Sequence, residues 1–364
     1  MTSVPAIELG PDRIIGSYRL VREIGRGGMA TVYEAEHVVL PRRAAIKIMH
    51  SELRKQPGMA TRVVQEASIL EDIRHPGIVG VYDCALLADH RPWIAMELVL
   101  GETLAARLLQ NGPLGPTEVA RLLADVADVL ASVHAKGVVH RDLKPDNLIL
   151  TPNDREFPLR VIDWGVARLG PMGRLTLDGL TPGTPIYMSP EQATGRNIAA
   201  PCDIYSLGVI AYEALTGHPP FDGRTLAEVV SMHLMSEAAP LRERCAASKE
   251  LCELVHRMLS KDPSLRPSAI EIRQLARRIA LELNHAYESL EIDGVDRSAP
   301  RHVSMAVAAT EDAVVVDPEA LEFGVTELVP TIRRPRWTPQ LGNVPVAPRA
   351  ACDQVAGEIL PKRR

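Results

Sequence analysis

A short turn at residues 139–147 concentrates side chains that could carry out group-transfer chemistry. Its sequence, Val-His-Arg-Asp-Leu-Lys-Pro-Asp-Asn, supplies a carboxylate at Asp142, an ammonium at Lys144 and an amide at Asn147. A second carboxylate, Asp163, follows a little further along the chain. Amide and carboxylate oxygens suit Mg²⁺. Asp142 could orient a hydroxyl or accept its proton, and Lys144 could neutralise a phosphate. The set predicts metal-assisted phosphoryl transfer to an alcohol.

Two apolar runs must position these groups. Residues 148–150 and 159–162 both predict short buried strands. Asn147 directly precedes the first run and Asp163 directly follows the second, so the strand ends would bring the polar groups into one neighbourhood. Pro145 predicts that the turn itself is loop and not the interior of a helix.

The N-terminal part of the chain predicts a strand over residues 18–24, a glycine-rich turn and a strand over residues 44–49. The turn begins Gly-Arg-Gly-Gly-Met-Ala at Gly25 and could bring backbone N–H groups close to an anion, although most glycine-rich turns bind nothing. Lys47 is the one charge in its strand, and an exposed strand lysine is the competing interpretation. A helix over the following residues carries Glu66, for which a solvated charge is the competing interpretation.

Taken in order, these motifs resemble those of protein kinases, most closely the bacterial, eukaryotic-like (Hanks-type) serine/threonine protein kinases. The resemblance covers residues 18–284 and includes Gly-Gly-Met-Ala-Thr-Val-Tyr, His-Arg-Asp-Leu-Lys-Pro-Asp-Asn and Tyr-Met-Ser-Pro-Glu-Gln-Ala. Ala30 stands where the family has a third glycine, and Trp164 stands where it usually has Phe. The resemblance implies an α+β, two-lobed fold. A small antiparallel sheet with one main helix would span residues 15–97, a hinge 97–101 and a mostly helical lobe 102–284.

The resemblance also implies the roles of individual residues. ATP would lie between the lobes, and Mg²⁺, with Mn²⁺ as the alternative ion, would be held by Asn147 and Asp163. Lys47 would contact the α and β phosphates and pair with Glu66, beside the catalytic Asp142 and Lys144. The positions matching the family's nucleotide contacts are Ile24, Gly25, Arg26, Gly27, Gly28, Val32, Ala45, Lys47, Met96, Glu97, Val99 and Ile149.

The substrate side is predicted around a long segment without periodicity, residues 166–189. Thr176 and Thr181 are the expected phosphorylation sites, where an added phosphate would pair with Arg141 and order the loop. By resemblance, Thr184 would bond Asp142 and Lys144, which points to serine or threonine as the acceptor.

Three more residues have structural roles by resemblance. Asp203 would brace the backbone of the catalytic turn, and Arg266 would form an ion pair with Glu191. We expect the loss of either Asp203 or Arg266 to disorganise the site.

The overall composition is that of an ordinary soluble protein. The chain has 364 residues, 46% of them apolar and 24% charged, and its net charge of −5 does not indicate a nucleic-acid partner. Its five cysteines lack metal-binding spacing and fit a reducing compartment. No apolar run approaches the roughly 20 residues of a membrane-spanning helix, and the N-terminus lacks a signal pattern. We therefore expect a cytoplasmic protein with protein substrates, which self-associates for autophosphorylation in trans.

The sequence also leads to expectations for the two ends of the chain and to two alternative functions. We expect a loose tail over residues 1–14 and a largely disordered extension over residues 285–364, with a docking or autoregulatory segment as the alternative for the extension. A pseudokinase scaffold, which would bind nucleotide or partners without transfer, is favoured by Ala30 and Trp164. The presence of Lys47, Glu66, Asp142, Asn147 and Asp163 opposes it. A small-molecule phosphotransferase is opposed by the Gly-Thr…Ser-Pro-Glu segment.

Overall fold

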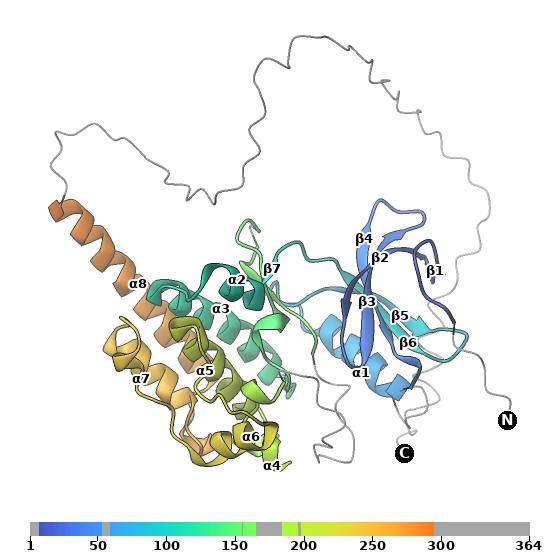
Figure 1. The fold of residues 1–364 in the computed structure, drawn as a ribbon. Coiled ribbons are helices and arrows are strands. Elements are labelled where there is room, and N and C mark those ends of the chain that lie inside the picture. The colour runs from blue at the N-terminus through green and yellow to red at the C-terminus, as the bar shows by residue number, and fades with distance from the viewer. Residues whose placement is uncertain (1–6, 53–58, 155, 165–183, 196–197, 295–364) are drawn as a thin grey trace, which may run out of the picture.

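The computed structural model describes residues 7–52, 59–154, 156–164, 184–195 and 198–294. These residues form a sheet-rich small lobe and a helical large lobe, joined by an extended segment between β6 (Pro92–Glu97) and β7 (Glu102–Thr103) (Figure 1). The α+β, two-lobed architecture predicted from the sequence is confirmed.

The small lobe is built on a six-stranded antiparallel sheet with the order β1-β2-β3-β4-β6-β5. Alternate residues of β4 enter different apolar layers, since Ile46 and Ile48 pack with Trp93 whereas Met49 packs with Val63 of the helix. The elements are β1 (Ile14–Ile15), β2 (Tyr18–Arg26), β3 (Ala30–His37), β4 (Arg43–Met49), α1 (Met59–Asp72), β5 (Val81–Leu86) and β6 (Pro92–Glu97).

The N-terminal segment is attached to this lobe. The backbone N–H of Ile7 donates to Asp89 Oδ2 at 2.8 Å, and the Ile7 carbonyl accepts from Arg91 Nη2 at 2.5 Å. Asp89 and Arg91 are themselves buried and paired, with 2.9 Å between Arg91 Nε and Asp89 Oδ2. The tail expected over residues 1–14 is therefore too long, because a buried ion pair distant in sequence holds Ile7 in place.

The large lobe packs its helices around α3 and α5, whose apolar side chains dominate its core. Three short strands form a second sheet with the order β7-β8-β9, and they carry the catalytic turn at their edge. Pro145 starts a single 3₁₀ turn, Pro145–Asn147, inside the predicted loop. The elements are β7 (Glu102–Thr103), α2 (Leu104–Asn111), α3 (Pro116–His134), β8 (Leu148–Leu150), β9 (Leu159–Val161), α4 (Pro190–Thr194), α5 (Pro201–Thr216), α6 (Leu226–Met235), α7 (Lys249–Met258) and α8 (Ala269–Gly294).

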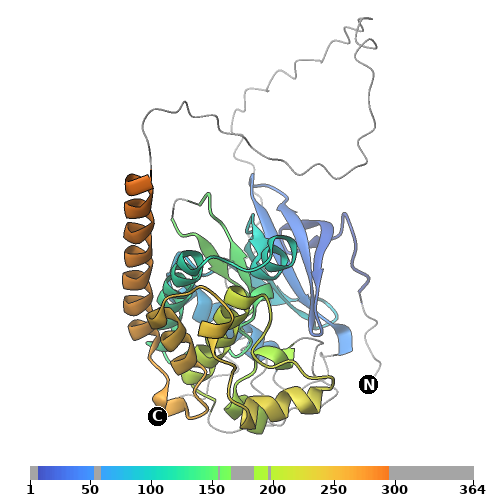
Figure 2. The same cartoon turned by 60° about the vertical axis from the view of Figure 1, so that its left-hand side comes forward.

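The last helix is longer than predicted. The sequence indicated a helix ending at residue 284, whereas α8 continues to Gly294 and runs along the outside of the large lobe (Figure 2). Asp128 of α3 binds two of its arginines, Arg273 at 2.6 Å and Arg277 at 2.8 Å. The sequence between residues 284 and 294 contains no helix breaker before the terminal glycine, so nothing in it stops the helix earlier.

Candidate active site

Strand register places the small-lobe candidates on one face of the sheet. Val32 of β3 lies opposite Lys47 of β4, and Ala45 lies opposite Met96 of β6. Directly opposed residues share a face, and Ala45 and Lys47 are two apart in the same strand. All four side chains therefore lie on the face that carries Met49 and α1, while Ile46 enters the other layer.

The glycine-rich turn connects β2 and β3 at the edge of this face. The N–H of Gly27 donates to the Ala30 carbonyl at 2.9 Å, which closes the turn. Gly25, Gly27 and Gly28 are exposed, and Ile24 is 39% exposed. Arg26 is bound by Glu23, with Nε 2.9 Å from Oε1 and Nη2 2.6 Å from Oε2. The turn thus presents backbone to solvent, as a phosphate-binding loop requires.

One contact joins the two lobes at the expected phosphate position. Lys47 Nζ lies 3.0 Å from Asp163 Oδ1. The charge of Lys47 is the main reason that the pKa of Asp163 lies below its ordinary value, so this carboxylate is ionised near neutrality. Asp163 has a φ of +57°, a left-handed conformation that is uncommon outside glycine and that directs the residue away from regular strand geometry. An ionised, exposed carboxylate beside a lysine is suited to a metal–phosphate group.

The catalytic turn brings Asp142, Lys144 and Asn147 together. Lys144 Nζ lies 3.8 Å from Asp142 Oδ2, and Asn147 Nδ2 donates to the Asp142 carbonyl at 2.8 Å. Because Nδ2 is used in that bond, the amide oxygen of Asn147 remains the group available to a cation. The described residues contain no cluster of three or more His, Cys, Asp or Glu side chains suited to a metal. The carboxylate of Asp163 and the amide oxygen of Asn147 suit an ion that takes its other ligands from phosphates or water.

Asp203 holds the backbone of this turn. Its carboxylate is 1% exposed and accepts from the N–H groups of His140 at 2.8 Å and Arg141 at 2.9 Å. His134 Nε2 lies 2.8 Å from the same carboxylate. Arg141 has a φ of +68°, so these bonds support a backbone conformation that an arginine seldom adopts. The bracing role expected of Asp203 agrees with this geometry.

His140 supports the turn from inside. The N–H of Asp142 donates to Nδ1 at 3.3 Å, so Nε2 carries the ring proton and donates it to the Ile162 carbonyl at 3.0 Å. Burial lowers the pKa of His140, which keeps the imidazole neutral. Trp164 packs against this ring with a centroid separation of 4.7 Å and is 1% exposed. Its Nε1 donates to the Val161 carbonyl at 3.3 Å, so the polar atom of the larger side chain is satisfied.

The substrate-side segment is tied to the turn by a residue that the sequence did not single out. Gln192 Nε2 donates to the Arg141 carbonyl at 2.8 Å. Its Oε1 accepts from the Ser189 N–H at 3.0 Å, while Ser189 Oγ accepts from the Gln192 N–H at 3.3 Å. The reciprocal Ser189–Gln192 bonds form a capping box at the start of α4, which is a recognisable sequence signal. The bond to Arg141 is long-range and has no such signal.

Glu191 and Arg266 form the ion pair expected from the resemblance. The Nη1–Oε1 and Nη2–Oε2 distances are 2.5 and 3.0 Å, so the pair is bidentate, and the Arg266 guanidinium is fully buried. Arg266 also donates to the carbonyl of Ser260 at 2.8 Å and to that of Pro201 at 2.8 Å. The pair therefore joins α4, α5 and the segment before α8.

At the lobe junction, the hinge positions Glu97 and Val99 are partly buried. A Cβ on Gly101 would overlap the carbonyl of Leu150, so only glycine allows this close approach. Ile149 of β8 pairs with Thr103 of β7 and is partly buried.

Other candidates lie wholly or partly outside the described residues. Thr176 and Thr181 are among residues 165–183, which the structure does not describe. Glu66 lies in α1 and Thr184 in a 3₁₀ turn, Thr184–Tyr187, but their side chains are outside the described part. The pairs expected of Glu66 and Thr184 therefore stay predictions.

Comparison with known proteins identifies the family of this chain. The protein kinase domain family matches residues 18–276. The chain is 38% identical over 304 residues to the serine/threonine-protein kinase pkn2 of Myxococcus xanthus, covering 81% of this chain and 36% of that protein. It is 34% identical over 334 residues to the serine/threonine-protein kinase PkaA of Streptomyces coelicolor, covering 87% of this chain and 60% of that protein. The chain thus spans less than two thirds of the length of these relatives.

A solved structure supports the fold. The kinase domain of PknI from Mycobacterium tuberculosis, crystallised as a double mutant, has a TM-score of 0.60 and 23% sequence identity, covering 75% of this chain and 100% of that chain. The family match includes the glycine-rich turn, Lys47, the catalytic turn and the Glu191–Arg266 pair. The chain therefore belongs to the protein kinase family, among the bacterial Hanks-type serine/threonine kinases.

Proposed function

We propose that the chain transfers the γ-phosphoryl group of ATP to serine and threonine hydroxyls of protein substrates. The observation that carries this proposal is the 3.0 Å contact between Lys47 Nζ and Asp163 Oδ1. It brings a cation from the small lobe to an ionised carboxylate of the large lobe, beside the catalytic turn. The relatives named as serine/threonine-protein kinases support the choice of acceptor.

In this proposal the small lobe binds and orients the nucleotide. The exposed end of β2 and the glycine-rich turn that follows it, together residues 24–28, direct backbone N–H groups to the phosphates, and Lys47 adds a positive charge beside them. Val32, Ala45, Met96 and Ile149 form the apolar surroundings of the base. Backbone groups of Glu97 and Val99 bond its polar edge.

The large lobe would hold the cation and the acceptor hydroxyl. Asp163 and the amide oxygen of Asn147 suit Mg²⁺, and Mn²⁺ would be accepted by the same oxygen donors. The bound ion supplies neutralisation of phosphate charge. Asp142 orients the acceptor hydroxyl and takes its proton, while Lys144, 3.8 Å from Asp142, stabilises charge on the transferred group. Thr184 would complete the acceptor side by bonding Asp142 and Lys144.

An Asp142→Asn variant tests the assignment. It keeps the size of the side chain and removes its capacity to take a proton, so transfer from labelled ATP should fall by about 10²- to 10⁴-fold. Nucleotide affinity, measured by titration with a fluorescent ATP analogue, should stay close to that of the wild type. Transfer that survives in Asp142→Asn would contradict the mechanism, and a wild-type chain that binds ATP without transfer would be a pseudokinase.

Regulation is proposed at Thr176 and Thr181. A phosphate on either residue could pair with the Arg141 guanidinium and order the loop, and self-association would allow one copy to phosphorylate another. Mapping of phosphopeptides after incubation with Mg²⁺ and ATP should find one of these sites. The idea fails if an unphosphorylated Thr176→Ala/Thr181→Ala variant keeps full activity.

We place the reaction in the cytoplasm, since the scattered cysteines suit a reducing compartment. Among the described residues, no helix has the length and apolar character needed to cross a membrane. The part of the extension beyond residue 294 lies outside the described structure, and a docking role for it stays a prediction.

A further inference from the structure

A buried arginine connects the large lobe to the start of the hinge. Arg160 of β9 is 5% exposed, and its Nε lies 3.4 Å from Oε1 of Glu97, the last residue of β6. This contact is an ion pair, since the buried Nε makes no hydrogen bond within the described residues. On its other side, Nη2 donates to Asp154 Oδ2 at 2.7 Å. Nη1 lies 3.2 Å from the Phe157 carbonyl and 3.3 Å from the Leu159 carbonyl. The guanidinium thus bridges two carboxylates from different segments and is anchored by the backbone of its own loop.

Glu97 is held from a second direction. Its Oε2 accepts from the Gly80 N–H at 3.3 Å, and its own backbone N–H donates to the Gly80 carbonyl at 2.8 Å. The strand that carries Arg160 also reaches this segment, because the Val161 N–H donates to the Gly77 carbonyl at 2.8 Å. Hydrogen bonds thus connect both the start of the hinge and strand β9 to the chain before β5, and the Arg160–Glu97 ion pair links the two directly.

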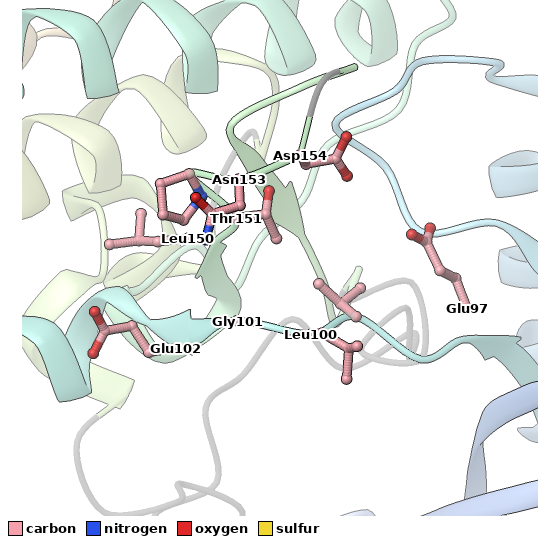
Figure 3. A pocket seen from close by; sticks show the side chains of 10 residues that line it. Glu97, Leu100, Gly101, Glu102, Leu150, Thr151, Asn153 and Asp154 are labelled. Atoms are coloured by element: carbon pink, nitrogen blue, oxygen red, sulfur yellow. The ribbon is translucent and has the colours of Figure 1, made fainter.

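Part of the hinge is separated from the β8–β9 loop. A pocket of about 530 Å³ lies between them, and Glu97 and Asp154 stand at its edge (Figure 3). Leu150 lines this pocket, whereas Ile149, the expected nucleotide contact, projects to the other face of β8. Glu97 and Val99 of the hinge also line the pocket. Besides the backbone pairing of β7 with β8, the Glu97–Arg160–Asp154 bridge links the hinge to this loop.

We propose that Arg160 is a positioning residue for the nucleotide: through Glu97 it fixes the hinge backbone that would bond the base. The inference rests on the proposed function of the cleft. Backbone groups that bind a ligand must be held within a fraction of an ångström to keep their hydrogen bonds. If the guanidinium is removed, two carboxylates lose their counter-charge, and the hinge loses its link to β9.

The test uses the full 364-residue chain and four variants: Arg160→Gln, Glu97→Gln, the double variant and Arg160→Lys. Arg160→Gln should weaken binding of a fluorescent ATP analogue and raise the KM for ATP by about three- to tenfold, with kcat and the KM for a protein substrate changed less than about twofold. The double variant should be no worse than Arg160→Gln, because Arg160 acts through Glu97. Arg160→Lys keeps the positive charge but lacks the planar guanidinium with its several N–H donors, so it should recover part of the affinity for ATP.

Arg91→Gln is the matched control. Arg91 is equally buried, at 6% exposure, and binds Asp89 and the Ile7 carbonyl at the turn between β5 and β6. Its loss should lower the melting temperature and leave the affinity for ATP unchanged. If Arg160→Gln behaved in the same way, Arg160 would be a structural residue only.

Two further results would also overturn the inference: a higher kcat with unchanged ATP affinity, which would make the bridge a restraint on lobe movement, and fully additive effects of Arg160→Gln and Glu97→Gln. Should Arg160→Gln fail to fold, Glu97→Gln and Arg160→Lys test the same expectation. The binding measurement does not need transfer. A wild-type chain that binds nucleotide without transferring phosphate would contradict the proposed function and would still decide the role of Arg160.

Discussion

The two halves of the candidate site are held in place by different means. In the small lobe, strand pairing sets the positions of Lys47 and its neighbours, and the sheet backbone supplies many equivalent bonds. In the large lobe, the catalytic turn has irregular backbone, with positive φ at Arg141, and depends on a few buried polar side chains such as Asp203. Substitution of Lys47 should therefore change chemistry alone, whereas substitution of the polar side chains that hold the catalytic turn should change chemistry and stability together.

The largest effect is expected from Asp203→Asn. The amide would present an NH₂ group to at least one N–H donor of His140 or Arg141, which would leave a buried donor without a partner. Unfolding free energy should fall by about 2–4 kcal/mol. Transfer should fall by about 100-fold or more, because the turn is displaced. Urea denaturation and a labelled-ATP assay measure the two quantities.

A matched control for this variant is Asp128→Asn on α3. Asp128 also binds two partners, Arg273 and Arg277, but far from the turn along the α3–α8 seam. It should lower stability and leave the rate of transfer per folded molecule unchanged. If Asp203→Asn kept full stability, the proposed dependence of the turn on Asp203 would be wrong.

Lys47→Met should separate chemistry from stability. Removal of a cation from the phosphate position should lower transfer by about 10²- to 10³-fold. The ion pair with Asp163 is partly solvated, with side-chain exposures of 17% for Lys47 and 44% for Asp163, so solvent screens it. Unfolding free energy should therefore change by less than about 1 kcal/mol. A large loss of stability in Lys47→Met would remove the contrast between the two halves.

The two halves also differ in how much of their structure the local sequence encodes. The apolar run over residues 44–49, with one charge, predicts a strand, and its observed register then places Ala45 and Lys47 on one face. The roles of Asp203 and of the Glu191–Arg266 pair came from family resemblance, since their partners are far away in the sequence. No local periodicity encodes such contacts. Gln192 was missed for this reason, because its bond to the Arg141 carbonyl depends on how α4 docks against the turn.

The end of α8 and the attachment of the N-terminal segment also differ from what the sequence predicted. The structure extends α8 to Gly294, which local sequence could have indicated, because no breaker precedes that glycine. It also attaches Ile7 to Asp89 and Arg91, which no local pattern indicates. Contacts between distant segments therefore explain most of what the sequence did not predict.

A smaller effect is expected from Trp164→Phe in the large lobe. The indole is fully buried and donates a hydrogen bond to the Val161 carbonyl. The smaller ring of Phe would leave a cavity, and the Val161 carbonyl would lose this hydrogen bond. Unfolding free energy should fall by about 1–3 kcal/mol. Transfer should stay within about threefold of the wild type, because Phe keeps an aromatic ring beside His140. Thermal denaturation with the labelled-ATP assay measures both. A variant that gained stability would mean that Trp164 is strained in this site.

The smallest effect is a pH dependence of the Lys47–Asp163 pair. Lys47 lowers the pKa of Asp163 in the folded chain, and a carboxyl with a lowered folded-state pKa adds stability above its unfolded pKa of about 4 and loses it below. The difference in unfolding free energy between wild type and Lys47→Met should thus be constant from about pH 7 to pH 5 and shrink at lower pH. Urea denaturation of both proteins across this range measures it, with Lys47→Arg, which keeps the charge, as control. A difference that grew on acidification would mean that the charge of Lys47 does not stabilise the ionised form of Asp163.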